Sequence, residues 1–248
     1  MRTKIYGHRG SKGTYPENTL LSFQKSIESG VDGLEIDIHM TKDGEIVIIH
    51  DETLERTTTG KGYIKDYTVK ELKSVSTGKK FKKMKAYEKE WDNETIPTLK
   101  ELFDLLAPTN IELNIELKTY IFQYPGIEEK LLEIVEEFGG KRKIVYSSFH
   151  LPTLIRLKNI KHDVKNAWLI NQEIPHPGDY LETFELEALH VNKNLVLENQ
   201  QYWKKYQEHL RVWTVNDKSE MKGLIEAGVD AIITDYPEVA LDLYTKRT

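Results

Sequence analysis

The amino-acid sequence predicts an α/β protein, a (β/α)8 TIM barrel with a small insertion after its second strand. Three observations lead to this fold. The chain has 248 residues, the usual length of such a barrel kept as a single unit. Eight predicted strands are each followed by a helix, so parallel strands with crossover helices are expected. No glycine-rich GxGxxG or GxxxxGKS/T motif follows a strand, which disfavours an open nucleotide-binding sheet.

The predicted strands are short apolar runs. Setting aside one returning hairpin strand, they begin at Lys4, Gly33, Ile111, Lys143, Val164, Ala188, Leu210 and Asp230. The first covers residues 4–8 and leads into Gly7-His8-Arg9-Gly10. In a parallel barrel, functional groups lie at the carboxyl ends of strands and in the loops that follow them. The residues at these strand ends are therefore the candidates for chemistry.

The predicted helices alternate with the strands. The first, at residues 17–29, has Leu20, Phe23 and Ile27 at core spacing. In the second, Thr98 and Glu101 are spaced as a capping box. The others are predicted at residues 126–138, 150–158, 177–184, 198–207, 217–227 and 237–244.

Residues 52–95 interrupt this alternation. Their apolar content is too low for a core of their own, so we expect a lid-like inserted region within one domain of residues 1–248. Thr68 and Glu71 predict a short capped helix there. A lysine-rich run follows at Lys79, Lys80, Lys82, Lys83, Lys85 and Lys89. It is either a solvated face, which we favour, or a surface that attracts anionic substrates.

Residues 33–51 predict a β-hairpin with Asp43-Gly44 at its turn. Alternation along the strand places Glu35 and Asp37 on one face. A two-residue loop would set Asp37 opposite His50. The hairpin would thus bring two carboxylates and a histidine together.

Acidic residues end two neighbouring predicted strands. Glu35 and Asp37 end the second strand and Glu116 ends the third. Three carboxylates at one rim raise each other's pKa, and a divalent cation with a preference for oxygen, Mg²⁺ or Ca²⁺, relieves the repulsion. The alternative is ion pairing, of Glu35 with Arg9 and of Glu116 with Lys118.

Two histidines, His8 and His50, share this rim. Imidazole titrates near neutrality, so one can act as a base and the other as an acid. Arg9 offers a planar fork of donors that suits phosphate, and Lys118 adds a positive charge. Together with a cation, these groups indicate a site for an anionic ester, most plausibly a phosphodiester.

Several nearby residues have structural interpretations. Glu17 and Asn18 lie at a helix start, where capping is at least as plausible as catalysis. Asp51 either orients His50 or stabilises its loop. We expect Asp235 to be structural, and His190 to be a packed or surface residue.

The chain resembles the glycerophosphodiester phosphodiesterase family. The resemblance rests on an ordered set of short motifs that covers almost the whole chain: His8-Arg9-Gly10, Pro16-Glu17-Asn18-Thr19, Glu35-Ile36-Asp37, Thr41-Lys42-Asp43-Gly44, His50-Asp51, Arg56-Thr57-Thr58, Ile96-Pro97-Thr98-Leu99, Asn114-Ile115-Glu116-Leu117-Lys118, Ser148-Phe149, Trp213-Thr214-Val215-Asn216 and Thr234-Asp235-Tyr236-Pro237.

The resemblance implies hydrolysis of small glycerophosphodiesters to sn-glycerol 3-phosphate and an alcohol, with one divalent cation, Mg²⁺ or Ca²⁺. It implies that His8 and His50 are the acid–base pair, that Arg9 and Lys118 hold the phosphate, and that the cation is held by Glu35, Asp37 and Glu116. Trp213 is either an inward core residue or, as we favour, a rim contact with the glycerol or the leaving group.

Two other functions compete with this one. The first is a related barrel phosphodiesterase resembling lysophospholipase D or sphingomyelinase D, which must admit an acyl chain; no obvious apolar lid is visible for one. The second is a non-catalytic barrel that binds a phosphorylated ligand, which would be expected to have lost one of the histidines or acids.

Composition narrows the setting of the protein. A net charge of −5 gives no reason to expect nucleic acid as a partner. The absence of cysteine excludes disulfides, thiolate metal sites and a cysteine nucleophile. The sequence shows no signal peptide and no apolar run long enough for a transmembrane segment. We expect a cytoplasmic protein, and the oligomeric state stays open.

Overall fold

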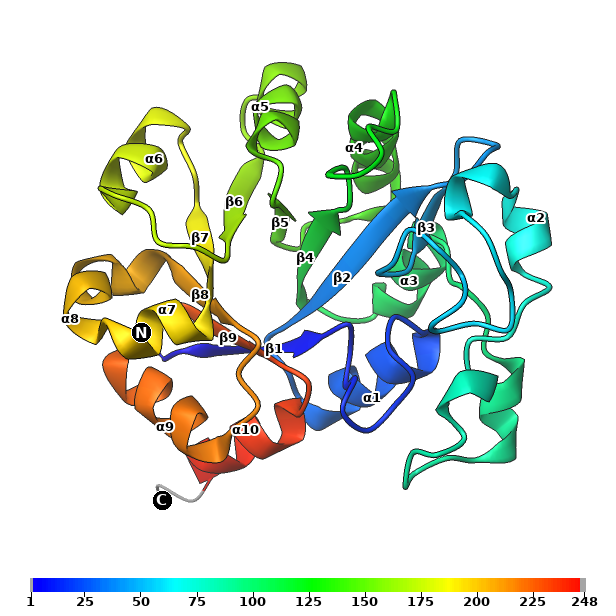
Figure 1. Cartoon of the computed structure of the whole chain (residues 1–248), viewed down its shortest axis with the longest axis horizontal. Coiled ribbons are helices and arrows are strands. Elements are labelled where there is room, and N and C mark those ends of the chain that lie inside the picture. Colours follow the sequence, from blue (N-terminus) through cyan, green and yellow to red (C-terminus); the bar gives the residue numbers. More distant parts are fainter. Residues whose placement is uncertain (1, 246–248) are drawn as a thin grey trace.

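The computed structural model describes residues 2–245 and forms a closed barrel of eight parallel strands with helices outside it (Figure 1). The strands are β1 Lys4–His8, β2 Gly33–Met40, β4 Glu112–Leu117, β5 Ile144–Ser148, β6 Lys165–Ile170, β7 Ala188–Asn192, β8 Leu210–Trp213 and β9 Ala231–Thr234. Pairing of β1 with both β2 and β9 closes the ring. The predicted TIM barrel is confirmed.

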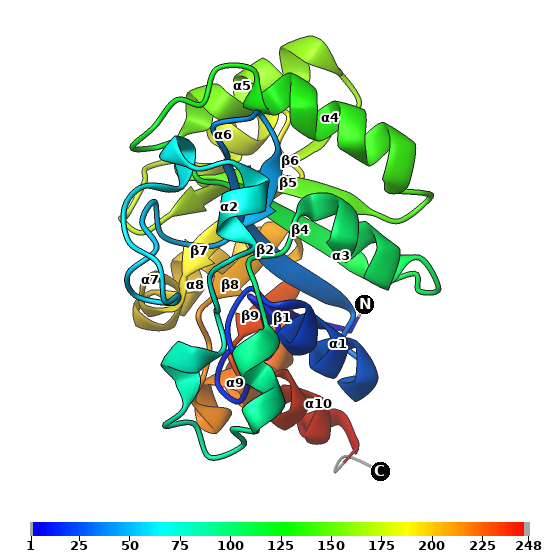
Figure 2. The ribbon, with the colours of Figure 1, turned by 90° about the vertical axis from the view of Figure 1, so that its right-hand side faces the viewer.

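Helices cover the barrel on its outer side (Figures 1 and 2). They are α1 Leu20–Ser29, α3 Leu99–Leu106, α4 Ile127–Phe138, α5 Leu151–Ile160, α6 Pro177–Thr183, α7 Lys193–Glu198, α8 Gln200–Trp203, α9 Lys218–Ala227 and α10 Pro237–Thr245. The outward strand residues Leu34, Ile36 and Ile38 pack with these helices in the main apolar core. No helix within the described residues is long and apolar enough to cross a membrane.

The helix predicted at residues 198–207 is wrong in extent. The structure instead has α7 and α8, followed by a 3-10 helix at Lys204–His209. The reason is local, because asparagine side chains compete for backbone donors. Asn192 accepts a hydrogen bond from the amide of Asn194, and Asn199 accepts one from the amide of Tyr202, so a new helix begins after each asparagine.

The hairpin is present, but its predicted register is wrong by one residue. Strand β3, Ile46–Ile48, pairs with β2 so that Ile38 faces Ile48. The loop has three residues rather than two: the amide of Gly44 donates to the carbonyl of Thr41, and Gly44 adopts a φ of 77°. This is the usual three-residue hairpin with glycine in the left-handed region. Asp37 therefore lies opposite Ile49, not His50.

The inserted segment packs beside the barrel around a small apolar cluster. Its elements are a 3-10 helix at Ile64–Asp66, α2 Val69–Leu72, and 3-10 helices at Lys79–Phe81 and Lys89–Asn93. The cluster joins β3 and the residues just outside the insertion to the insertion itself: Val47, Ile49, Leu54, Ile64, Leu72 and Ile96. The capping box of Thr68 and Glu71 is confirmed. The lysine-rich run lies beside α1 (Figure 2). Just after the run, the ring of Trp91 packs on that of Tyr15, in the loop before α1, with centroids 5.6 Å apart.

The amino-terminal end of the barrel is filled by a polar network in which Arg211 and Tyr6 are buried and their charged partners are half-buried. Arg211 on β8, one of the largest fully buried side chains, donates to Asp230 over 2.8 Å. Its guanidinium lies 5.3 Å from the ring centroid of Tyr6, whose hydroxyl donates to Glu112 over 2.5 Å. Lys4 donates to the same carboxylate over 2.8 Å. These groups close the amino-terminal end of the barrel, so the open site lies at the carboxyl ends of the strands.

Candidate active site

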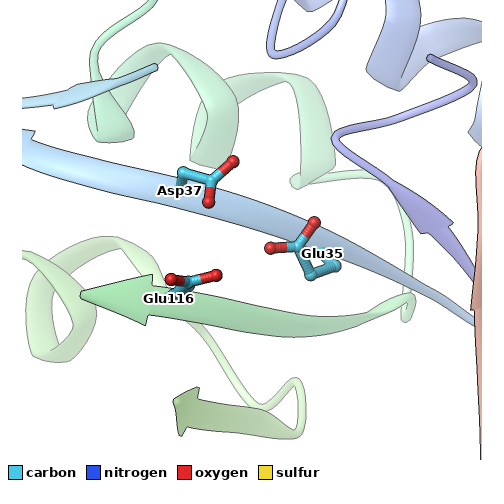
Figure 3. A group of neighbouring side chains, drawn as sticks. All are labelled: Glu35, Asp37 and Glu116. Carbon is cyan, nitrogen blue, oxygen red and sulfur yellow. The ribbon is translucent and has the colours of Figure 1, made fainter. Parts of the chain in front are cut away.

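Three carboxylates meet at the carboxyl ends of β2 and β4. Glu35 and Asp37 come from β2 and Glu116 from β4, and Figure 3 shows the three side chains as neighbours along these two adjacent strands. One oxygen from each lies within 4.8 Å of the others, and all three side chains are buried. The register causes this meeting, because Asp37 pairs with Glu116 across the ladder.

Burial and mutual repulsion divide the three acids. Burial, with the charges of Asp37 and Glu116, raises the pKa of Glu35 well above its ordinary value. Burial also raises the pKa of Glu116. Burial acts on Asp37 too, but the positive charges of Arg9 and Lys118 outweigh it and hold its pKa below the usual range. Without a further positive charge, the cluster thus favours one ionised acid and disfavours ionisation of the others.

Arg9 and Asn18 bind the acidic cluster and hold two of its carboxylates in place. The guanidinium Nε of Arg9 lies 3.1 Å from Asp37, and its Nη1 donates to Glu17 over 2.8 Å. The backbone amide of Arg9 donates to the side chain of Glu35 over 3.1 Å. Asn18 donates its side-chain amide to Asp37 over 2.9 Å. The structure does not form the expected ion pair of Glu35 with Arg9: the Arg9 guanidinium pairs with Asp37 and Glu17, and Glu35 accepts only from the Arg9 backbone amide.

His8 ends β1 and faces the acids. Its Nδ1 lies 2.5 Å from Asp235, and its Nε2 lies 3.9 Å from Glu35. A carboxylate accepts, so Nδ1 carries the proton and Nε2 offers a lone pair to the site. Burial lowers the pKa of His8, and the hydrogen bond with Asp235 offsets part of that effect. Asn216 donates to the other oxygen of Asp235 over 2.8 Å.

His50 reaches the same site from the loop after β3. Its Nδ1 lies 2.6 Å from Asp51, and its Nε2 lies 3.2 Å from the ammonium of Lys118. Lysine only donates, so Nε2 of His50 holds a lone pair. His39 donates from Nε2 to the carbonyl of His50 over 3.0 Å. Because His50 lies beyond the β3 ladder, the one-residue change in register does not turn it away from the acids.

Lys118 joins the second histidine to the acids. Its ammonium donates to Glu116 over 2.9 Å and lies 3.7 Å from Asp37. The expected pairing with Glu116 is therefore present, alongside the acid cluster rather than in place of it.

A cavity of about 200 Å³ opens among these groups. Both histidines, Arg9, Lys118 and two of the acids line it. Trp213 also lines it, and its ring packs edge-on to Phe149 with centroids 5.6 Å apart. A second hollow of about 450 Å³ shares Lys118 and Phe149 with the first and continues to Tyr120. Another hollow, of about 360 Å³ beside Trp203, has no histidine in its lining.

Sequence reasoning missed the roles of several residues of this site, Asn18 among them. Glu17 does not cap α1, since Thr19 does. The Glu17 carboxylate instead joins Arg9 to Arg56, which donates to it over 2.8 Å. Asp235 contacts His8, and His190 is fully buried and lines the cavity. A usable signal existed for His190, because Asn114, Ser147 and His190 are polar residues within short strands of a closed barrel.

Comparison with solved structures defines the class of protein first. An Oleispira antarctica phosphodiesterase, solved in complex with the product sn-glycerol-3-phosphate, matches with a TM-score of 0.89 and 28% identity, covering 98% of this chain and 97% of that one. A glycerophosphodiester phosphodiesterase of Thermotoga maritima matches with a TM-score of 0.76 and 30% identity, covering 98% and 99%. The barrel is that of a phosphodiesterase.

Comparison of sequences then gives the family. Residues 8–239 match the glycerophosphoryl diester phosphodiesterase family. A glycerophosphodiester phosphodiesterase of Caldanaerobacter subterraneus is 39% identical over 247 residues, 99% of each chain. One from Bacillus altitudinis is 39% identical over 245 residues, 97% of this chain and 98% of that one. The chain belongs to this family and is an enzyme, so the non-catalytic alternative falls.

Proposed function

We propose that the protein hydrolyses glycerophosphodiesters to sn-glycerol 3-phosphate and an alcohol, with one divalent cation and with His8 and His50 as the acid–base pair. The observation that carries this proposal is the arrangement at the rim. Two histidines, each with a carboxylate at its Nδ1, flank three buried acids, and both histidines and two of the acids line one cavity. The related Oleispira antarctica enzyme was solved with the product named here.

The donor set fits a divalent cation. Glu35, Asp37 and Glu116 would hold it, since carboxylate oxygens are the ligands that Mg²⁺ and Ca²⁺ prefer. The buried Oδ1 of Asp37 has no hydrogen-bond partner, which agrees with an oxygen reserved for a ligand. When bound, the cation supplies positive charge to a non-bridging phosphate oxygen.

The side chains divide the remaining work. Arg9 and Lys118 would hold the phosphate beside the acids, and the carboxylates of Asp235 and Asp51 orient the two imidazoles. Nε2 of one histidine would take the proton from the attacking oxygen, which is that of water or of the substrate's own glycerol hydroxyl. Attack by the hydroxyl would give a cyclic phosphate, which water would open to sn-glycerol 3-phosphate in a second step. The other histidine, protonated at Nε2, would give its proton to the departing alcohol oxygen.

We further propose that residues 52–95 belong to the single catalytic domain of residues 1–248 rather than forming a domain of their own. Arg56 supports this view, because it donates to both oxygens of Asp51 and to Glu17. The inserted segment thus reaches the partner of His50. Both interpretations of its lysine-rich run, the solvated face that we favour and a lid that attracts anionic substrates, stay predictions.

A second candidate is hydrolysis of lysophospholipids. The adjoining hollow favours it, since Tyr120 and Ile121 line that hollow with 76% and 61% of their surfaces exposed. A human lysophospholipase D is 24% identical over 273 residues. Such apolar groups at the rim could contact the acyl chain, which a lysophospholipid carries on its glycerol moiety while choline is the leaving alcohol.

One assay separates these candidates. The purified enzyme is stripped with EDTA, and release of glycerol 3-phosphate is coupled to its dehydrogenase with Mg²⁺ or Ca²⁺ added back. We expect release from glycerophosphocholine only with metal. Lysophosphatidylcholine is followed in parallel by choline release. No release from any diester with either metal would refute the proposal, and faster release of choline from the lysolipid would favour the second candidate.

A further inference from the structure

His190 on β7 is a buried histidine whose ring has no hydrogen-bond partner. Its side chain is 0% exposed, and neither Nδ1 nor Nε2 contacts a donor or acceptor. Its carbonyl, in contrast, accepts from the indole of Trp213 over 2.9 Å. Buried polar groups are nearly always paired, so two unpaired nitrogens on one ring require an explanation.

The cavity among the acids supplies the setting. His190 lines it from β7, and Asn114 and Ser147 line it from β4 and β5. Asn114 donates its amide to the hydroxyl of Ser147 over 3.0 Å, while its own Oδ1 is buried and unpaired. The mechanism above uses none of these three residues. They form a polar floor in a cavity whose rim carries the acids, the histidines and the cations.

The chemistry of this floor selects a class of ligand. Burial, together with the charge of Arg211, lowers the pKa of His190 well below its ordinary value, so the ring is neutral. A neutral imidazole has one N–H donor and one acceptor nitrogen, and Asn114 adds an acceptor oxygen. An aliphatic hydroxyl is also both donor and acceptor. A polyol can therefore pair with these groups, whereas an alkyl group would leave them unpaired.

We propose that His190, with Asn114, is a specificity-determining floor that binds the hydroxyl groups of the glycerol moiety while the phosphate lies at the acids above. This assignment rests on the proposed function and names the part of the substrate that the floor recognises. The larger hollow beyond Phe149 is then left for the departing alcohol.

Two substrates test the floor directly. The first is glycerophosphocholine, and the second is its analogue in which the terminal CH₂OH of glycerol is replaced by CH₃. The analogue keeps the 2-hydroxyl, which could serve as the attacking group. We expect kcat/KM of the wild-type enzyme to fall by about tenfold on the analogue, because its methyl group leaves buried partners unpaired.

Variants of His190 sharpen the test. His190→Leu removes both nitrogens, so we expect the ratio of kcat/KM on glycerophosphocholine to kcat/KM on the analogue to fall towards one. His190→Gln keeps a donor and an acceptor, so we expect it to restore part of the preference. His162→Leu changes an exposed histidine outside the cavity and serves as the matched control, with the wild-type preference retained.

The outcomes separate the two levels of the proposal. If the wild-type enzyme hydrolyses no diester with Mg²⁺ or Ca²⁺, the proposed function itself fails. If it hydrolyses both substrates with equal kcat/KM, or if His190→Leu retains the full preference, the floor assignment is overturned and water alone pairs with the ring. The wild-type comparison needs no variant, so it decides the matter even if His190→Leu does not fold.

Discussion

The two histidines at the rim are held in different ways. His8 belongs to barrel strand β1, its side chain is 11% exposed, and its partner Asp235 follows another barrel strand, β9. The side chain of His50 is 30% exposed, and it lies on a loop outside the barrel ladder. The barrel itself therefore positions one imidazole, whereas the other depends on groups that the hairpin and the inserted segment bring to it.

Those supporting groups form a continuous chain of contacts. Asp51 contacts His50, Arg56 binds Asp51 and Glu17, and Glu17 binds Arg9 beside the acids. From below, His39 holds the carbonyl of His50. An irregular loop can therefore hold a histidine beside a barrel strand when charged hydrogen bonds take the place of the backbone hydrogen bonds of the sheet.

The largest effect should come from removing either imidazole. We expect His8→Ala and His50→Ala each to lower kcat by about 10²–10⁴-fold, as for general acid–base groups elsewhere. The rate is measured on glycerophosphocholine with metal present, and thermal unfolding checks the fold. His209→Ala, at an exposed position, is the control. Near-normal turnover by either variant would remove that histidine from the mechanism.

Removing the carboxylate partners should have a smaller effect. We expect Asp235→Asn and Asp51→Asn to lower kcat by at least roughly tenfold, since a carboxylate that orients a metal-bound histidine is worth about ten- to a hundredfold. A double-mutant cycle separates orientation from other roles. Asp235→Asn should cost nothing further in the His8→Ala background, nor Asp51→Asn in the His50→Ala background. Additive losses would show that these acids act independently of the histidines.

Acid should weaken the support beneath His50. Burial lowers the pKa of His39 to about 4, whereas an unfolded histidine titrates near 6.5. Between these pH values the unfolded chain binds a proton that the folded chain does not, so the free energy of unfolding falls as the pH falls through this window. We expect the loss between pH 7 and pH 5 to be smaller by roughly 2 kcal/mol in His39→Gln than in the wild type.

Urea unfolding at the two pH values measures this difference. The exposed His162→Gln variant is the control and should lose as much stability as the wild type. An equal loss in His39→Gln and the wild type would mean that His39 does not carry the pH dependence.

The smallest effect should come from replacing Lys12, the charged residue farthest out on the His8 side of the site. Lys12 lies 3.9 Å from Asp235, and its side chain is 28% exposed. Lys12 lines the edge of the cavity and its contact with Asp235 is long, and ion pairs near the surface contribute about 0–1 kcal/mol, so we expect Lys12→Ala to change kcat by less than about fivefold. A loss as large as that of Asp235→Asn, measured on the same substrate, would show that Lys12 touches the substrate itself.

The barrel and the acid cluster were predictable because both depend on local patterns. Alternation along β2 gives Glu35 and Asp37 one face, and parallel pairing brings Glu116 beside them. The hairpin loop was not predictable, since Asp43-Gly44 suits both a two-residue and a three-residue turn. In the three-residue loop of the structure, Asp43 accepts a hydrogen bond from the amide of Val69, a residue distant in the sequence.

The supporting residues were missed for a related reason. Glu17 binds Arg56 across 39 positions of sequence, and nothing beside Glu17 announces that partner. His190 looked like an ordinary buried histidine because its type and position in β7 are compatible with packing. The polar residues on short barrel strands are a signal for such a site, but the structure is needed to show that His190 lines a cavity.

The polar network of Arg211, Tyr6 and Glu112 bears on the order in which the two products leave the site. Because it closes the amino-terminal end of the barrel, the site is a well with its mouth at the rim. A fragment bound at His190 must therefore leave after a fragment bound nearer the mouth. The alcohol would depart first and glycerol 3-phosphate last, so accumulation of that phosphorylated product would keep the well filled and slow the enzyme that makes it.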